Sequence, residues 1–170
     1  MNGKMDQLPR VKGVKPGKLP WTLEIAWHDG SRSNADLTGL VHRSRHFRRF
    51  LEEPLAFRKV RVVEWGAGIG WDNGLDYSAD TLRTMAEEQQ PLAGKDLQAF
   101  EAANKLNTAE MAALLDVSER TIREYRGAVR LPQPVALALR AMLTNTAVLD
   151  AHYRPADRRP RGRPRKSASA

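Results

Sequence analysis

Cysteine is absent from the 170 residues of the sequence. Its absence excludes disulfides, thiolate nucleophiles and cysteine-ligated zinc or iron–sulfur centres, so we expect a cytosolic protein. Long hydrophobic runs are absent as well. The longest, residues 134–143, is interrupted by Arg140 and is too short to cross a bilayer, and residues 1–10 have no apolar signal-peptide core. We expect neither secretion nor membrane insertion.

The sequence also lacks a pattern typical of a phosphate-binding or calcium-binding loop. The glycine run 66–70 leads into a strand-like segment, whereas a nucleotide loop must open a helix, so we expect a turn there. Asp72, Asp76 and Asp80 do not have the spacing of a calcium loop, because Gly74 comes too early. These aspartates are expected to form turns and to start a helix.

Metal-binding and catalytic side chains give no clear pattern either. His42 and His46 have the i, i+4 spacing of paired metal ligands. Arg43 stands where a metalloprotease helix places its glutamate, and Arg45 would repel a cation. We therefore expect surface histidines, no metal or other cofactor, and no enzymatic activity.

Positive charge is present in excess, and it lies at the two ends of the chain. The net charge is +8: residues 1–20 carry +4, residues 151–170 carry +6, and the segment between them carries −2. Lys and Arg in such segments neutralise phosphates and release counterions, which indicates a polyanionic partner. The alternative is that the basic ends only keep the protein soluble.

The first half of the sequence has the pattern of a small α+β domain. Residues 21–27 alternate as in a strand, and Asp29-Gly30 provides a turn into a second strand. We further expect a basic stretch with helical spacing at 43–51, strands at 57–65 and 69–71, a turn at 73–74, and a helix from Ser78 to about Glu88. Pro91 and Gly94 then mark a boundary.

Several motifs in this half carry a family resemblance. HDGSRSNADLTGL, FRKVRVV and GIGWDNGLDYSADTL resemble the bacterial domain-of-unknown-function family 2442, over residues 11–90. Members are often found beside regulatory helix-turn-helix sequences. The resemblance implies a small α+β fold and no catalytic residues.

The second half contains the pattern of two short helices joined by a tight turn. Asn107 and Glu110 have the spacing of a capping box, so a helix is expected to begin there. Asp116 occupies the turn, Ser118 is the cap of the next helix, and Ile122 lies on its buried side. The expected buried set also includes Met111, Ala112, Leu115, Val117 and Tyr125.

This pattern resembles the helix-turn-helix of the phage-repressor (Xre/Cro) class, with residues 94–150 as the DNA-binding domain. The family usually has Gly where this chain has Asp116, so a strained left-handed residue is expected. The alternative is an ordinary helical hairpin with accidental small-residue spacing.

The resemblance implies that helix 118–127 enters the major groove. Arg120 and Arg123 are the candidates for guanine, Thr121 for a thymine methyl and Glu119 for cytosine. An exposed ion pair between Arg120 and Glu124 is the alternative role for these two side chains. The expected groove residues are Ser118, Glu119, Arg120, Thr121, Arg123 and Glu124, and the expected phosphate contacts are Asn107, Thr108, Arg126 and Arg130.

The basic C-terminal segment 158–166, RRPRGRPRK, resembles an AT-hook. Gly162 would let the backbone approach the floor of a narrow minor groove while Arg161 and Arg163 run along it. Pro160 and Pro164 keep the segment extended, and Arg165 adds a further cation. A basic solvated tail is the alternative, and residues 151–170 are expected to be disordered in either case.

Together these patterns predict an α+β protein with a flexible basic arm (1–10), an α+β domain (11–90), a helix-turn-helix domain (94–150) and a basic tail (151–170). The predicted function is a sequence-specific transcriptional regulator that binds double-stranded DNA as a homodimer in the bacterial cytoplasm, associated with the nucleoid. The alternative is an antitoxin-like module, whose N-terminal domain binds a protein partner and whose helix-turn-helix autoregulates.

Overall fold

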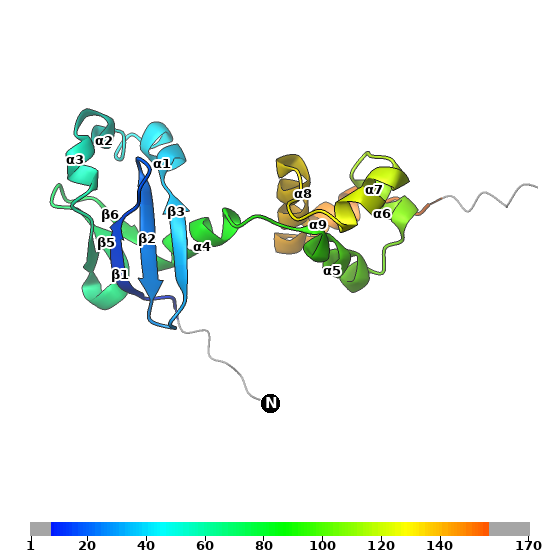
Figure 1. Cartoon of the computed structure of the whole chain (residues 1–170), viewed down its shortest axis with the longest axis horizontal. Helices are drawn as coiled ribbons and strands as arrows, with labels where there is room; N and C mark the ends of the chain where they lie inside the picture. Colours follow the sequence, from blue (N-terminus) through cyan, green and yellow to red (C-terminus); the bar gives the residue numbers. More distant parts are fainter. Residues whose placement is uncertain (1–7, 157–170) are drawn as a thin grey trace, which may run out of the picture. The chain divides into compact units, whose positions relative to one another are not determined.

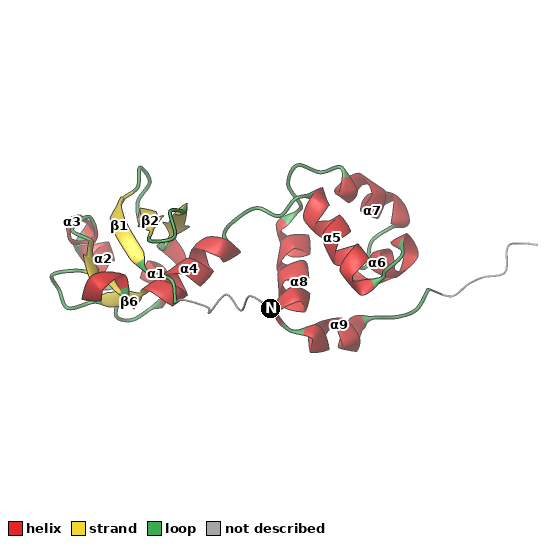
Figure 2. Cartoon of the chain, turned by 90° about the horizontal axis from the view of Figure 1, so that it is seen from below, coloured by secondary structure: helices red, strands yellow, loops and turns green. Residues whose placement is uncertain are grey.

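The structure is a computed structural model that describes residues 8–156. The chain divides into two compact units, Met1–Gln90 and Pro91–Ala170, here called the N-terminal and C-terminal units. In the described residues, strands occur in the N-terminal unit and the C-terminal unit is built from helices and loops (Figures 1 and 2). The expected α+β fold class is confirmed.

The first sheet of the N-terminal unit is antiparallel, with the order β1-β2-β3. Its strands are β1 (Val11–Pro16), β2 (Thr22–Trp27) and β3 (Arg32–Asp36). Leu23, Ile25 and Trp27 of β2 are buried, which confirms the alternation read from the sequence. The sequence reading missed strand β1, because Gly13 and Pro16 weaken its strand pattern.

The second sheet has the order β4-β5-β6 and consists of β4 (Arg61–Val63), β5 (Gly68–Gly70) and β6 (Asp76–Ser78). The strand expected over residues 57–65 is wrong in its extent. Helix α3 (Pro54–Phe57) precedes β4, and the 3-10 turn η1 (Glu64–Gly66) follows it. The strand ends at Val63 because the next two residues, Glu64 and Trp65, have left-handed φ angles of 47° and 51°.

Short helices and aromatic side chains complete the N-terminal unit. Helices α1 (Thr38–Arg43), α2 (Arg49–Glu52) and α3 gather at one end of the first sheet (Figure 1). The expected basic helix over 43–51 is interrupted, because Ser44 is extended with ψ of 127°. Phe47, Phe50 and Trp71 pack edge-on or tilted in the core. Helix α4 (Ala79–Glu88) follows Ser78 as predicted.

The C-terminal unit contains α5 (Gly94–Asn104), α6 (Thr108–Leu114), α7 (Glu119–Arg126), α8 (Gln133–Thr144) and α9 (Thr146–His152). Leu97, Met111, Ile122 and Leu139 lie at the centre of its core. Gly94 allows α5 to begin against the end of α7, since a Cβ there would lie 2.2 Å from the carbonyl oxygen of Arg126. Within residues 8–156, no helix has the length and apolar character needed to span a membrane.

Candidate nucleic-acid interface

Helix α6 begins at a complete capping box. The Asn107 side-chain oxygen accepts from the Glu110 backbone N–H at 3.0 Å, and the Glu110 carboxylate accepts from the Asn107 N–H at 2.9 Å. Tyr153 adds a third contact, because its hydroxyl donates to Glu110 at 2.9 Å. This hydrogen bond raises the pKa of Tyr153. The predicted start of the helix is confirmed, and α9 is connected to it through Tyr153.

The turn between α6 and α7 has the expected strained residue. Asp116 has φ of 52°, in the left-handed region that favours glycine. The following N–H, from Val117, donates to the carbonyl of Ala112 at 2.9 Å, and the Val117 side chain packs against the core. The turn therefore fixes the direction in which α7 leaves α6.

Helix α7 has one buried side and one exposed side. Ser118 caps it by accepting from the Thr121 N–H at 3.1 Å, and Ile122 is fully buried. Arg120 and Arg123 lie on the exposed side, as their helical positions predict. Glu119 and Glu124 are exposed with them, so the outer face of α7 presents both signs of charge.

The two exposed arginines are each paired within the helix. Arg120 Nε lies 2.9 Å from a Glu124 carboxylate oxygen, and Arg123 Nη2 lies 2.9 Å from one of Glu119. The Arg120 and Arg123 side chains keep 86% and 62% of their surface exposed. The i, i+4 pair considered as an alternative for Arg120 is therefore present. Exposed pairs of this kind stabilise a helix by only about 0.3 to 0.5 kcal/mol, so they can exchange partners.

Arg126 differs from these arginines, because its guanidinium is engaged inside the unit. Nε and Nη2 donate to the two carboxylate oxygens of Glu101 on α5, each at 2.9 Å, and Nη2 also donates to the Thr108 hydroxyl at 2.9 Å. The hydrogen bonds to Glu101 raise the pKa of Arg126. Arg126 and Thr108, both expected at phosphates, are thus bonded to each other, and their visible role is to join three helices.

Glu101 is the residue that the sequence reading missed. It is only 6% exposed and is the buried charged residue of the described chain. A signal was present in the sequence, because Leu97, Phe100 and Glu101 have the i, i+3, i+4 spacing of one face of a helix. A carboxylate at such a position requires a partner, and sequence alone does not show which cation provides it.

The other predicted DNA-binding residues lie at several places. Asn107 is occupied by the capping box, Thr121 is partly buried in the first turn of α7, and Arg130 is exposed after α7. Arg161, Gly162, Arg163, Pro164 and Arg165 lie outside the residues that the structure describes.

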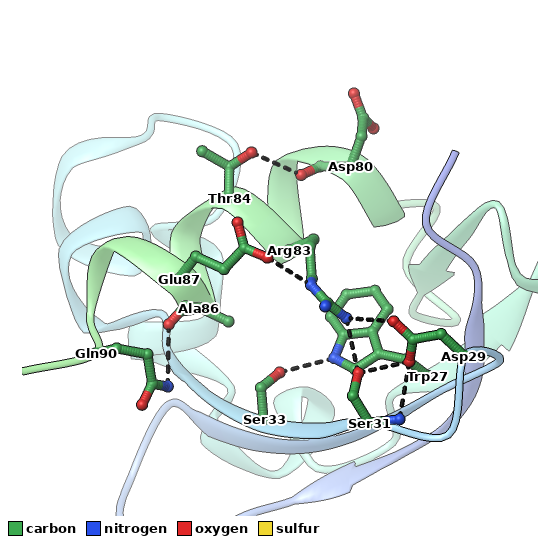
Figure 3. Close-up of polar contacts among 10 residues, drawn as sticks. All are labelled: Trp27, Asp29, Ser31, Ser33, Asp80, Arg83, Thr84, Ala86, Glu87 and Gln90. Atoms are coloured by element: carbon green, nitrogen blue, oxygen red, sulfur yellow. Dashed lines mark hydrogen bonds and ion pairs between the residues drawn. The ribbon is translucent and has the colours of Figure 1, made fainter. Parts of the chain in front are cut away.

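The N-terminal unit has a cavity of about 810 Å³ beside α4, lined by Leu8, Pro9, Arg10, Trp27, His28, Asp29, Arg83 and Glu87. Figure 3 shows one of the lining residues, Arg83 of α4, next to the Trp27 ring and in contact with Asp29, Ser31 and Glu87. Its guanidinium carbon lies 4.9 Å from the Trp27 ring centroid, and its nitrogens lie 2.7 Å from Glu87 and 3.3 Å from Asp29. Asp29, Arg83 and Glu87 therefore bind one another and hold α4 to the β2–β3 turn, whereas Arg10 donates to the Trp65 carbonyl at 3.2 Å.

Residues 8–156 contain no group of three or more His, Asp or Glu side chains placed to hold a metal ion. His42 and His46 are both exposed, and Asp72 forms an ion pair with Arg61. The glycine run enters strand β5 rather than a helix, as expected from the sequence.

No family model matches the chain, and no curated protein does either. One solved structure, that of a proposed DNA-binding protein from Nitrosomonas europaea, is similar with a TM-score of 0.44 and 23% sequence identity. The similarity covers 79% of this chain and 86% of that protein. With a TM-score this low, the likeness carries no argument about function.

Proposed function

We propose that the protein is a sequence-specific DNA-binding transcriptional regulator that reads the major groove with helix α7. The observation that carries this proposal is the geometry of α6 and α7. A capping box, a left-handed turn residue and a buried Ile122 hold α7 against its neighbour, and its outer face presents Arg120 and Arg123 to solvent. These features match the docking requirements of a helix-turn-helix.

Base reading requires the two arginines to exchange partners. In free protein each guanidinium donates to a glutamate one turn away. A guanine offers O6 and N7 as two acceptors in the major groove, which suits the two-pronged donor of arginine better than a single carboxylate oxygen. Glu119 and Glu124, once released, can accept from a cytosine amino group. The proposed reading residues are thus already exposed and weakly held.

Phosphate contacts are proposed for one group just beyond α7 and for one at the start of α6. Arg130 is exposed just beyond the helix, and Asn107 lies at the start of α6. The AT-hook-like residues 161–165 are proposed to bind the minor groove or backbone, on the strength of the sequence motif alone. Such contacts set the register of the protein on DNA without reading sequence.

Further properties follow from the proposal. Binding as a homodimer would place two α7 helices on paired half-sites, as helix-turn-helix proteins require. A regulator of this kind needs no cofactor and no catalytic activity, and it acts in the bacterial cytoplasm and nucleoid. The family-2442-like N-terminal unit would then serve for dimerisation or for binding a protein partner.

The test is selection of a preferred site from a random DNA pool, followed by binding measurements with Arg123→Ala. We expect this change to weaken binding to the preferred site by about 1 to 3 kcal/mol and to relax selectivity at one base pair. Lys95→Ala removes an exposed cation from α5 and provides the matched control. Equal weakening of Arg123→Ala on every sequence would show that Arg123 contacts only phosphate.

An antitoxin-like role is a second candidate, and apolar side chains on the N-terminal unit favour it. Leu19 and Leu55 are 70% and 76% exposed beside a hollow of about 210 Å³, and Trp65 is 93% exposed. Exposed apolar side chains that gather around a hollow, as Leu19 and Leu55 do, are one mark of a protein-binding surface. Stoichiometric co-purification of a small partner, abolished when both leucines are changed to serine, would support this role. The intact chain purifying alone and selecting one DNA sequence would contradict it.

A further inference from the structure

Residues 42–49 of the N-terminal unit, His42 to Arg49, form an exposed basic segment that the proposed base-reading helix does not use. The segment reads HRSRHFRR, and no acidic residue occurs between Asp36 and Glu52. We call it the arginine segment. Its four arginines, Arg43, Arg45, Arg48 and Arg49, are all exposed.

The fold holds this segment in a fixed conformation. Val41 just before it and Phe50 just after it are fully buried, and Phe47 within it is 7% exposed. The Phe47 ring packs edge-on against Trp71 with 5.7 Å between ring centroids. The Ser44 carbonyl accepts from the Arg48 N–H at 2.9 Å. The aromatic side chains therefore point into the core while the arginines stay outside.

None of the four arginines forms an ion pair with a carboxylate of the described residues. Arg45 donates to His46 Nε2 at 3.1 Å, and Arg49 donates to the Asn73 carbonyl at 3.4 Å. The arginines on the outer face of α7, in contrast, each have a glutamate partner. The arginine segment thus presents positive charge that its surroundings do not neutralise.

We infer that the arginine segment binds the phosphate backbone of double-stranded DNA, as a second contact surface of the proposed regulator. Guanidinium groups suit phosphates because they donate two parallel hydrogen bonds to one anion. This inference adds to the proposed function and rests on DNA being the ligand. It gives the N-terminal unit a binding role that needs no pocket.

The side chains of the segment favour duplex DNA over other polyanions. Single strands are bound by exposed aromatic rings on which bases stack, whereas Phe47 and Phe50 are buried. Amphipathic membrane-binding helices insert apolar side chains among the lipids, and residues 42–49 expose none. What remains exposed is a set of cations, which matches a phosphate backbone.

The test uses the full-length chain with Arg43→Gln, Arg45→Gln and Arg48→Gln combined. Binding to a labelled duplex of random sequence is measured by fluorescence anisotropy over a range of salt concentrations. We expect the slope of log K against log salt to become shallower by roughly 0.9 for each phosphate that the variant no longer neutralises. The ratio between the affinities for the selected site and the random duplex should stay unchanged, because these arginines read no bases.

Two controls make the result specific to this segment. The first control combines Lys12→Gln, Lys18→Gln and Lys59→Gln, which remove the same charge from other exposed positions of the N-terminal unit. This control should alter the salt slope by less than the triple arginine change does. The same three arginines changed to lysine keep the charge and should keep most of the slope. If the triple variant loses its native tryptophan fluorescence, the salt slope is measured on the single variant Arg45→Gln instead.

The inference would be overturned if the triple Arg→Gln variant and the triple Lys→Gln control had equal salt slopes. It would also be overturned if duplex binding were unchanged while binding to phosphatidylserine vesicles fell. Failure of the proposed function would look different: the parent protein would show no sequence preference, and Arg120→Ala with Arg123→Ala would change nothing. The effect of the arginine segment on random duplex would still be measurable in that case.

Discussion

Removing the Arg126 guanidinium should destabilise the C-terminal unit more than removing any exposed arginine of α7. Glu101, its partner, has a side chain only 8% exposed, so Arg126→Met leaves a carboxylate in the core without its cation. Breaking a buried pair costs about 3 to 5 kcal/mol. Because the Arg126 side chain is 31% exposed, water can solvate part of the Glu101 carboxylate once the guanidinium is gone. We therefore expect Arg126→Met to lower the free energy of unfolding by about 2 to 3 kcal/mol.

The chain contains a convenient internal reference for this measurement. All four tryptophans, at positions 21, 27, 65 and 71, belong to the N-terminal unit. Urea unfolding followed by tryptophan fluorescence therefore reports on that unit, while circular dichroism at 222 nm reports mainly on the helices of the other. With a slope of about 1 kcal/mol per M urea, the midpoint of the helical transition should fall by roughly 2 to 3 M. The fluorescence transition should not move.

Arg123→Met is the matched control, because Arg123 is also paired with a glutamate but lies on the surface. It should cost less than about 0.5 kcal/mol. Adding Glu101→Leu to Arg126→Met should restore most of the stability, since it replaces the stranded carboxylate by an apolar group. Equal costs for Arg126→Met and Arg123→Met, with no restoration by Glu101→Leu, would refute the reasoning.

Four further variants test other features. Asp116→Gly should raise the stability of the C-terminal unit by about 0.5 to 1 kcal/mol in urea unfolding, because glycine adopts the left-handed backbone without strain. Lys105→Gly should act in the same direction, since Lys105 has φ of 56°. Hydrogen bonds from Ser31 lower the pKa of Asp29, so the stability from Asp29 is present above its unfolded pKa and is lost as the pH falls through the folded pKa. Asp29→Asn should make the acid loss of native fluorescence shallower, and an unchanged acid profile would contradict this. Truncation after Asp157 should reduce the salt slope of DNA binding and abolish any preference for A·T-rich flanks. Unchanged binding would show that residues 158–170 serve only to keep the protein soluble.

Local patterns in the sequence were enough to locate the helices around the proposed interface. The capping box of Asn107 and Glu110 joins residues three apart, and the buried side of α7 repeats at helical spacing. The capping box and the helical spacing depend on interactions within one or two helical turns, so the sequence order alone specifies them. The left-handed conformation of Asp116, in contrast, was expected from the helix-turn-helix resemblance, because that class usually has Gly at this position.

Features that depend on distant partners could not be read in the same way. Glu101 and Arg126 are 25 positions apart, and only the packing of α5 against α7 brings them together. Strand β1 pairs with β2 although Gly13 and Pro16 give it a weak strand pattern of its own. The strands β4, β5 and β6 have three residues each, too few for a period to appear.

The distribution of ion pairs gives the outer face of α7 and the arginine segment different roles in the proposed regulator. On α7, Glu119 and Glu124 neutralise the arginines beside them, so this face attracts phosphates weakly and gains only where a base pair offers better acceptors. The arginine segment has no such glutamates and attracts any phosphate backbone. Sequence selectivity should therefore come from α7, and most of the salt-dependent affinity from cations elsewhere. Neutralising Glu124 would remove that separation, because Arg120 would then bind phosphates on every sequence.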